Sequence, residues 1–494
     1  MTKNYLAITI GPIDKTLAKA SRTREVWLSS YIFSYLMGLI VTEIIARKIG
    51  KVILPDSSLL DNWKAYYGAG VFNDRCIVEL EKEFGFSDFV NLRECVINNF
   101  LLGKQLSSSP EQENTRANLH KFYEDPVMTE PLKLSADTLK DYLQIYGLVT
   151  SFDPEKDTIV NNLNILLDGL ERQSSYQLRN NNIIEQFFEN VAWFYPLGFD
   201  LKNKEIKQLE LVHQYFCVVH INADNLKNYY NQIGNNWNVV NMFNNCMISF
   251  SKEAAKIIND FGGQPIYMAG DDLFFIAPVL TTFKENICNV FDLIRILDFI
   301  FKDIFSKKGI QPLPDLSCGL SVSHNNYPLA EAVLHSKNML SKAKNMPSKN
   351  SIAVQLNYSE GKSCQAIFNK SKNASFDDFI ELLKDFPSKS FYISSIQGKI
   401  HNNMKLLQVI GKDNPPDFSG FLGNEYKPAD NSTRLFIERS SRIFTAIFKE
   451  QKLLYAGGAT LFDTEVIAKA CEGAILQLDS IYRLLNFLTH TDHG

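Results

Sequence analysis

The sequence predicts an α+β protein built from two similar halves, and three observations lead to this prediction. Apolar runs typical of strands alternate with helical patterns near the N-terminus and again in the middle of the chain. The segment between these regions, and the segment after the second, have mainly helical patterns. The 494 residues are 45% hydrophobic and 21% charged, as in soluble globular proteins, and suffice for about three domains.

Charge and cysteine usage narrow the class of protein. The net charge of −4 argues against a free-standing protein that coats nucleic acid, although local patches could still touch RNA. The eight cysteines include no Cys-x-x-Cys pair, so we expect neither a local zinc knuckle nor a disulfide framework. This cysteine usage predicts a cytoplasmic location. Leu28 to Ala46 is very apolar, but Glu43 interrupts it, which predicts a buried helix and no membrane partner.

The N-terminal half begins with a predicted strand. Tyr5 to Ile10 is apolar and ends at Gly11-Pro12; a long helix through Trp27 and Met37 follows. Lys51 to Leu54 predicts a second strand. The turn-rich Gly68 to Arg75 could line a pocket or simply connect two elements. From Leu132 to Asn190 the pattern is largely helical and predicts an insert without chemistry of its own.

The second half repeats the scheme with acidic residues at its turns. Tyr215 to Ile221 predicts a strand, and Asp224 lies just past its end. Apolar residues from Phe243 to Phe261 recur at helical spacing until Gly262-Gly263 ends the helix. Two short apolar runs then flank Ala269-Gly270-Asp271-Asp272, which predicts a hairpin with two carboxylates at its tip.

Such a βαββ unit can bring the two acidic sites to one sheet edge. Paired carboxylates on a rigid turn suit hard divalent cations that hold nucleotide phosphates. This is the layout of a polymerase or cyclase palm. The alternative is that Gly-Asp-Asp is an ordinary hydrophilic turn, because such turns are common.

Elements after the hairpin continue the pattern. We expect an amphipathic helix from Phe283 to Phe305, and a βαβ unit of Leu316 to Val322, Leu329 to Lys344 and Ser351 to Leu356. Residues 357–375 are polar and predict a linker, after which the sequence is helical to the end. The predicted domains are therefore 1–130, 131–210, 211–360 and 361–494.

The motifs resemble those of the large subunit of type III-B CRISPR effector complexes, the Cmr branch, whose palms are similar to GGDEF cyclases. The resemblance rests on Asn222-Ala223-Asp224, on the Ala269–Asp272 turn, and on Ile10-Gly11-Pro12 with Ser21 to Ser30. It implies two ferredoxin-like, GGDEF-like palm domains with a helical insert and a C-terminal helical domain. Two departures stand out. Asn222 replaces a metal-binding carboxylate, and Ala269 replaces the first glycine.

The resemblance also implies roles for particular residues. Asp271 and Asp272 would be catalytic and, with Asp224, would hold Mg or Mn. ATP would be the substrate, contacted by Asn222, Asn225, Gly270, Ser317, Lys344 and Ser30. Lys344 closes its helix, so the helix dipole alone also explains a lysine there. The first palm shows no acidic pair at the matching turn and is expected to be an acceptor or scaffold half.

The implied function is an antiviral, RNA-guided one. The chain would join other type III-B subunits with guide RNA and target RNA, and would make a signalling nucleotide when the target pairs with the guide. The product would be cyclic oligoadenylate, or an AMP adduct of S-adenosylmethionine as co-substrate. The family often begins with an HD nuclease domain; the first strand here starts at residue 5 and no His-Asp dipeptide occurs, so no such nuclease is expected.

Two other functions remain open from the sequence. Asn222 could mark the decay of the metal site in a catalytically inactive, nucleotide-binding scaffold of the same complex. Against this, the chain keeps Asp224, Asp271 and Asp272. A free-standing diguanylate cyclase is disfavoured by the two palm-like halves and the long helical C-terminal region.

Overall fold

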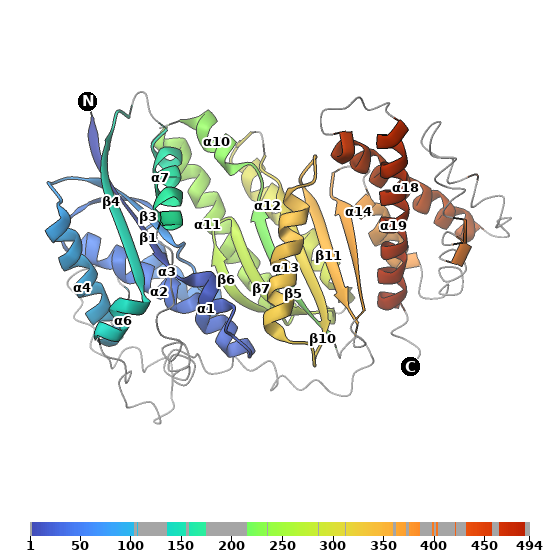
Figure 1. The fold of residues 1–494 in the computed structure, drawn as a ribbon, viewed down its shortest axis with the longest axis horizontal. Coiled ribbons are helices and arrows are strands. Elements are labelled where there is room, and N and C mark those ends of the chain that lie inside the picture. The colour runs from blue at the N-terminus through green and yellow to red at the C-terminus, as the bar shows by residue number, and fades with distance from the viewer. Residues whose placement is uncertain are drawn as a thin grey trace.

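The fold is an α+β arrangement of two sheet domains followed by a helical region (Figure 1). The structure is a computed structural model. It describes residues 2–102, 106, 136–154, 158–173, 215–234, 236–284, 286–311, 313–358, 362–371, 375–385, 398–399, 402–403, 420, 431–456 and 464–489.

The first domain has a four-stranded antiparallel sheet in the order β2-β3-β1-β4. Its connectivity, with helices after β1 and after β3, is that of a ferredoxin-like domain. The strands are β1 (Lys3–Gly11), β2 (Gly50–Leu54), β3 (Arg75–Leu80) and β4 (Gln144–Phe152). The helices are α1 (Ile13–Leu17), α2 (Thr23–Ala46), α3 (Leu59–Asn62), the 3-10 turn η1 (Trp63–Tyr66), α4 (Phe86–Leu102), α6 (Ala136–Tyr142) and α7 (Ile159–Gln173).

Side chains along β1 alternate between the two faces of this sheet, and both faces are covered by helices. Leu6 and Ile8 lie in the main core with α2, whereas Tyr5 and Ala7 pack against α7 in a separate apolar cluster. Among the described residues, α2 is the one helix long and apolar enough to cross a membrane by length and composition, and 83% of its apolar window is buried. This burial confirms the predicted core helix.

Two predictions for this half were wrong. The long helix expected after Gly11 is divided into α1 and α2, with Glu25 accepting hydrogen bonds from the backbone of Ser21 and Arg22 to start α2. The largely helical pattern expected from 132 to 190 contains β4, which pairs with β1 along its whole length. As an edge strand, β4 is only partly buried, so its hydrophobic pattern is weak.

The second domain has a six-stranded sheet in the order β12-β11-β10-β5-β7-β6. Its strands β10-β5-β7-β6 repeat the ferredoxin-like order of the first domain, and α13 makes a parallel crossover from β10 to β11. The strands are β5 (Tyr215–Ala223), β6 (Gln264–Ala269), β7 (Asp272–Pro278), β10 (Leu316–His324), β11 (Ser351–Asn357) and β12 (Ser363–Asn369). The helices are α10 (Leu226–Ile233), α11 (Trp237–Asp260), α12 (Val290–Lys307) and α13 (Leu329–Lys344).

Two expectations around this sheet also need correction. The helix predicted from Phe283 begins only at Val290, because β8 (Leu280–Phe283) pairs with β9 (Asn286–Asn289) and the Asn289 side chain caps α12. Ile287, which falls inside the predicted helix, instead lies in β9 and is 77% exposed. The predicted linker 357–375 contains β12, which pairs in register with β11.

The C-terminal region is helical where it is described, as predicted. It consists of α14 (Ser375–Asp385), α18 (Asn431–Ala456) and α19 (Thr464–Thr489), which lie beside β12 at the right of Figure 1. The Gln477 side chain of α19 accepts a hydrogen bond from the backbone of Ile367, 2.8 Å away. The helices therefore extend the sheet domain at its β12 edge.

The two sheet domains are joined through a loop of the first domain. Gly70 forms an isolated parallel bridge with Tyr267 of β6, with hydrogen bonds from Gly70 N to Ile266 O (3.0 Å) and from Met268 N to Gly70 O (2.7 Å). Ile266 lies in a bulge between β6 and β7, which leaves its carbonyl available for this contact. The Ser34 hydroxyl accepts hydrogen bonds from the next two backbone amides of the loop, which fixes it to α2.

Candidate functional site

The acidic hairpin forms as the sequence predicts. Ala269 of β6 pairs with Asp272 of β7, which leaves Gly270 and Asp271 as a two-residue loop. Gly270 has a positive φ of 64°, the conformation that favours glycine at the first position of a type II′ hairpin loop. The loop therefore holds Asp271 and Asp272 at a fixed tip.

The end of β5 completes this tip. Asn222 is the cross-strand partner of Asp272, and Ala223 N donates to Asp271 O at 3.1 Å. The Asn222 amide also donates to Asp271 Oδ2 at 3.3 Å. Asn222 thus occupies the position beside both aspartates where the resemblance implied a carboxylate.

Helix α13 brings a positive charge to the same place. Lys344, in its last turn, donates a hydrogen bond from Nζ to Asn222 Oδ1. The helix can lie this close because Gly319 of β10 has no side chain: a Cβ there would be 2.2 Å from Ser336 O and 2.1 Å from Leu340 N. Ser336 of α13 also bonds to the buried His220 ring at 2.8 Å.

The carboxylates of the tip are hard to ionise. Burial, then the charge of Asp271, raises the pKa of Asp272 to about 6, and the charges of Lys337 and Lys344 oppose this rise. Burial also raises the pKa of Asp271, against the opposing effects of its own backbone amide, Lys344 and Asn222. Crowded, partly buried carboxylates of this kind are typical of sites that bind cations or carry out chemistry.

The first domain adds a further acidic residue. Asp74 lies directly before β3, at the end of the loop that is bonded to β6. Burial raises its pKa to about 6, and the charge of Asp272 contributes to the rise, while Asp74 in turn raises the pKa of Asp271. The loop that the sequence left open as pocket wall or connector therefore lies within electrostatic range of the hairpin. The sequence of this loop did not predict that Asp74 contributes to the site, because Asp74 is not part of an acidic pair in the chain.

Asp224 points to different partners. Its Oδ2 accepts hydrogen bonds from the Ser317 hydroxyl (2.7 Å) and from Asn350 N (3.0 Å), and it is 2% exposed. Its Oδ1 is buried without a hydrogen-bond partner. Asn225, which has a left-handed backbone, accepts from Lys349 at 2.6 Å. The side chains of Ser317 and Asn225 are therefore bonded to Asp224 and Lys349, although Ser317 is also the cross-strand neighbour of Asn222 at the tip.

Ser30 lies in helix α2 of the first domain, where it is buried at 8% exposure. Of the nine predicted site positions, the structure brings together Asn222, Gly270, Asp271, Asp272 and Lys344.

The described side chains at the tip are suited to binding a cation through two carboxylates and do not form a cage of three. Within the described part of the chain, no group of three or more His, Cys, Asp or Glu side chains is arranged to hold a metal. Asp271 and Asp272 are adjacent oxygen donors whose mutual repulsion a divalent cation would relieve, and hard cations take such ligands. Asp271 and Asp272 are thus candidate metal ligands at the tip, while the nearby Asp224 has one carboxylate oxygen bonded to Ser317 and Asn350 and the other buried without a partner.

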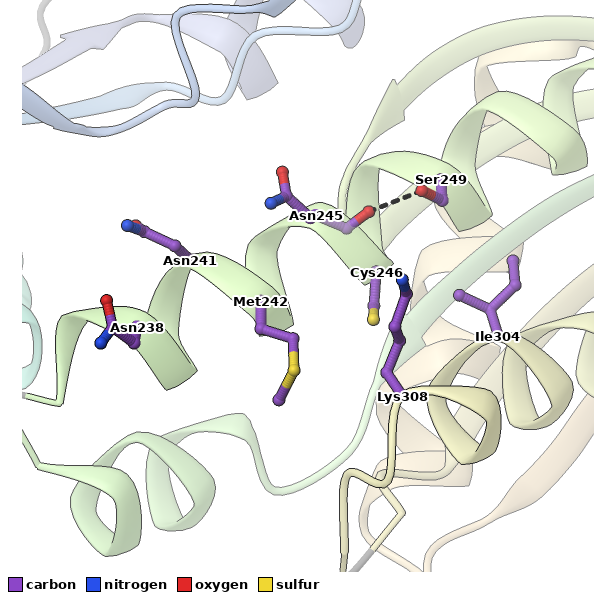
Figure 2. A pocket seen from close by; sticks show the side chains of 8 residues that line it. All are labelled: Asn238, Asn241, Met242, Asn245, Cys246, Ser249, Ile304 and Lys308. Carbon is purple, nitrogen blue, oxygen red and sulfur yellow. Dashed lines mark hydrogen bonds between the residues drawn. The ribbon is translucent and has the colours of Figure 1, made fainter.

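The structure also has a cavity of about 360 Å³ away from this site. It is an open hollow between α11 and α12 (Figure 2), in which the amides of α11 project along one side and Lys308 and Ile304 come from the α12 side. Its lining carries no carboxylate, so it is not the place for the chemistry predicted above. The lining residues are Asn238, Asn241, Met242, Asn245, Cys246, Ser249, Ile304 and Lys308.

Comparisons with known proteins agree with this architecture. Residues 215–353 match the family described as Cas10/Cmr2, second palm domain, and residues 5–101 match the family described as CRISPR-associated protein Cmr2, N-terminal. No curated protein matches the chain.

Two solved structures of a type III-B Cmr-beta complex contain chains of similar fold. In the apo state, the TM-score is 0.51 at 10% identity, covering 86% of this chain and 77% of the other. In the complex bound to cognate target RNA, the TM-score is 0.53 at 11% identity, and the match covers 86% of this chain and 78% of the other. At this identity the likeness shows the fold alone, and the two family matches apply to the residues that they cover. The chain is therefore similar in sequence to Cas10/Cmr2 proteins over residues 5–101 and 215–353, and similar in fold to the Cmr-beta chains.

Proposed function

We propose that this chain is the large subunit of a type III-B CRISPR effector which, when target RNA pairs with guide RNA, uses ATP to make a signalling nucleotide. One observation carries the proposal. The partly buried Asp271–Asp272 pair, flanked by Asn222 and Lys344, lies within electrostatic range of Asp74, which ends the first-domain loop that is bonded to β6. A nucleotide bound there would touch both domains.

The residues have separate roles in this proposal. Asp271 and Asp272 would hold Mg or Mn on the triphosphate of one ATP, and Lys344 would bind a phosphate oxygen. When bound, the metal would neutralise charge on the phosphates. Asn222 would orient Asp271 through its amide, as it does in the structure. Catalysis would consist mainly of positioning and charge stabilisation.

The chemical step is a nucleotidyl transfer. The 3′-hydroxyl oxygen of a second ATP, losing its proton, would bond to the α-phosphorus of the first while the bond to the leaving β-phosphate breaks, releasing pyrophosphate. Repetition and closure would give a cyclic oligoadenylate. With S-adenosylmethionine as the acceptor, a single transfer would give its AMP adduct.

The partners follow from the family. The Cmr-beta complex of similar fold was solved bound to cognate target RNA. We propose that this chain likewise assembles with other type III-B subunits in the cytoplasm and meets guide and target RNA through them.

Product analysis tests the proposal. The chain is assembled with its partner subunits, guide RNA and target RNA, and is supplied with ATP and Mg or Mn, with and without S-adenosylmethionine. Products are identified by mass spectrometry. Cyclic adenylates from ATP alone, or an adduct that requires S-adenosylmethionine, would support the proposal and name the product. No product in either mixture, in a complex that binds target RNA, would refute it.

A second candidate is a catalytically inactive scaffold that still binds nucleotide. It is favoured by Asn222, which lacks the expected charge, and by Asp224, which is bonded to Ser317 and Asn350 instead of joining the tip. The scaffold predicts that ATP binds to the assembled complex without turnover. The enzyme predicts that turnover accompanies binding and is lost with Asp271→Asn plus Asp272→Asn.

A further inference from the structure

Helix α13 presents two lysines that lie seven residues apart. Lys344 bonds to Asn222 at the hairpin side, whereas Lys337 donates from Nζ to Asp14 of α1 in the first domain. Seven residues correspond to about two turns, or about 10 Å along the helix axis. One helix therefore places one lysine at the carboxylate tip and another against the opposite domain.

The position of these lysines is fixed by the contacts that hold α13 against the sheet. Ser336, next to Lys337, is buried and bonded to His220, whose ring stacks on Phe274 with centroids 4.2 Å apart. The close approach at Gly319 fixes the helix at the backbone of Ser336 and Leu340. Neither lysine can leave the site by a movement of the helix alone without breaking these contacts.

The charge of Lys337 affects a carboxylate of the tip. Its charge, like that of Lys344, opposes the rise in the pKa of Asp272 that burial and Asp271 cause. It also adds to burial in lowering the pKa of His220. Lys337 therefore lies within electrostatic range of Asp272, while its hydrogen bond to Asp14 puts it at the first domain.

The bond between Lys337 and Asp14 is easily exchanged. The Lys337 side chain is 37% exposed and that of Asp14 is 84% exposed. Exposed ion pairs of this kind contribute little to stability, whereas a phosphate offers a lysine more charge and several acceptor oxygens. A phosphate that reached Lys337 would displace Asp14 at little cost.

This inference rests on the nucleotide function proposed above. We propose that Lys337 is a second phosphate-binding lysine, which exchanges Asp14 for the triphosphate of an ATP bound between the two domains. Asp14 then competes with ATP for Lys337. Binding of ATP releases one ionic contact between the domains and replaces it with a contact through the nucleotide.

The test measures ATP affinity of the assembled complex in the presence of Mg, by calorimetry, for the parent and five variants: Lys337→Gln, Asp14→Asn, both together, Lys344→Gln and Lys342→Gln. Lys337→Gln is expected to weaken binding about tenfold, the loss of one charge-assisted hydrogen bond. Asp14→Asn is expected to tighten it severalfold, and the double variant to bind like Lys337→Gln. Lys342→Gln is the matched control, because Lys342 of the same helix bonds to Gln365 of β12 and should leave affinity unchanged.

Three outcomes would overturn the inference. Unchanged affinity in Lys337→Gln, with weaker binding in Lys344→Gln, would refute a role for Lys337 and leave the proposed function standing. Tightening by Asp14→Asn that persists in the Lys337→Gln background would mean that Asp14 acts by its own repulsion and not through Lys337. No ATP binding by the unaltered complex would refute both the inference and the proposed function.

Discussion

At the scale of single residues, the site is a set of charges that the fold crowds together. Asp271 and Asp272 are neighbours in sequence, and Asp74 reaches them from the other domain. Ionising all three in a partly buried place costs folding free energy unless a cation or a lysine offsets it. The tip is therefore less stable by itself than with a bound cation.

Asp272→Asn should stabilise the protein in a pH-dependent way. The pKa of Asp272 is raised from 3.8 to about 6, so the folded state binds its proton more tightly than the unfolded state. The stability that this proton provides is fully present below about pH 4 and is lost as the pH rises through 6. The amide carries no such cost, so we expect a gain on the order of 1 kcal/mol at pH 7 to 8 that disappears near pH 4.

Thermal melts without divalent metal, from pH 4 to 8, measure this effect. Asp303→Asn is the control, because Asp303 is a surface residue of α12 paired with Lys307. An equal shift at all pH values, or a loss of stability at pH 8, would contradict the raised pKa.

Part of this site could be predicted from the sequence. Gly270, Asp271 and Asp272 form a local turn, and such a turn depends only on neighbouring residues. Asp74, Asp14 and Lys337 could not be assigned, because their relevance comes from packing between residues far apart in the chain. Asp224 was assigned to the tip, but its carboxylate bonds to Ser317 and Asn350, which no local pattern reveals.

At the scale of elements, one close contact positions α13. The backbone of Ser336 and Leu340 touches the position that a side chain on Gly319 would fill. Both lysines of the site depend on this contact, because they project from the same helix. The stability of the α13–β10 contact and the geometry of the site are therefore coupled.

Gly319→Ala should displace α13. The added Cβ would lie 2.1 Å from Leu340 N, and backbone cannot move aside as a flexible side chain can. We expect a loss of about 3 kcal/mol in the free energy of unfolding, together with weaker ATP binding. Urea denaturation measures the first effect and calorimetry the second.

Gly169→Ala is the matched control for this substitution. Gly169 lies in α7 and a Cβ there would meet nothing within 4 Å. Alanine favours a helix over glycine by about 1 kcal/mol, so this variant should be as stable as the parent or more so. If Gly319→Ala behaved like Gly169→Ala, the close contact would not position α13.

The elements also show where sequence patterns succeed. The spacing of apolar residues predicted α13 and β11 with their correct starts, because α13 buries one face and β11 is buried along its whole length. The edge strands β4 and β12 were missed. Each has one neighbour in its sheet, so its pairing, not its hydrophobic pattern, defines it.

At the scale of the whole molecule, the site exists only if the two domains are joined. The joint includes the Gly70 bridge to Tyr267, the Lys337–Asp14 pair, and hydrogen bonds from the Tyr66 hydroxyl to Ile248 O and from the Tyr267 hydroxyl to Phe72 O. The sequence predicted two palm-like halves but not this joint, because its hydrogen bonds use backbone atoms of a turn and a bulge.

Gly70→Val should open this joint while leaving each sheet intact. A Cβ at Gly70 would lie 2.9 Å from the Ser34 Cβ and 3.3 Å from the Tyr267 ring, so valine would push β6 away from the loop. We expect faster hydrogen exchange at the Met268 amide and reduced nucleotide turnover. Unchanged exchange at Met268 would show that the bridge does not hold the domains together.

The central claim is that the Asp271–Asp272 tip turns over ATP in the assembled complex. The most direct measurement is the rate of pyrophosphate release with guide RNA, target RNA, ATP and Mg. We compare the parent chain, Asp271→Asn with Asp272→Asn, and the control Asp303→Asn. The account predicts target-dependent release that falls at least about 100-fold in the double variant and is kept in the control. Equal release by the double variant, or none by a parent complex that binds ATP, would contradict it.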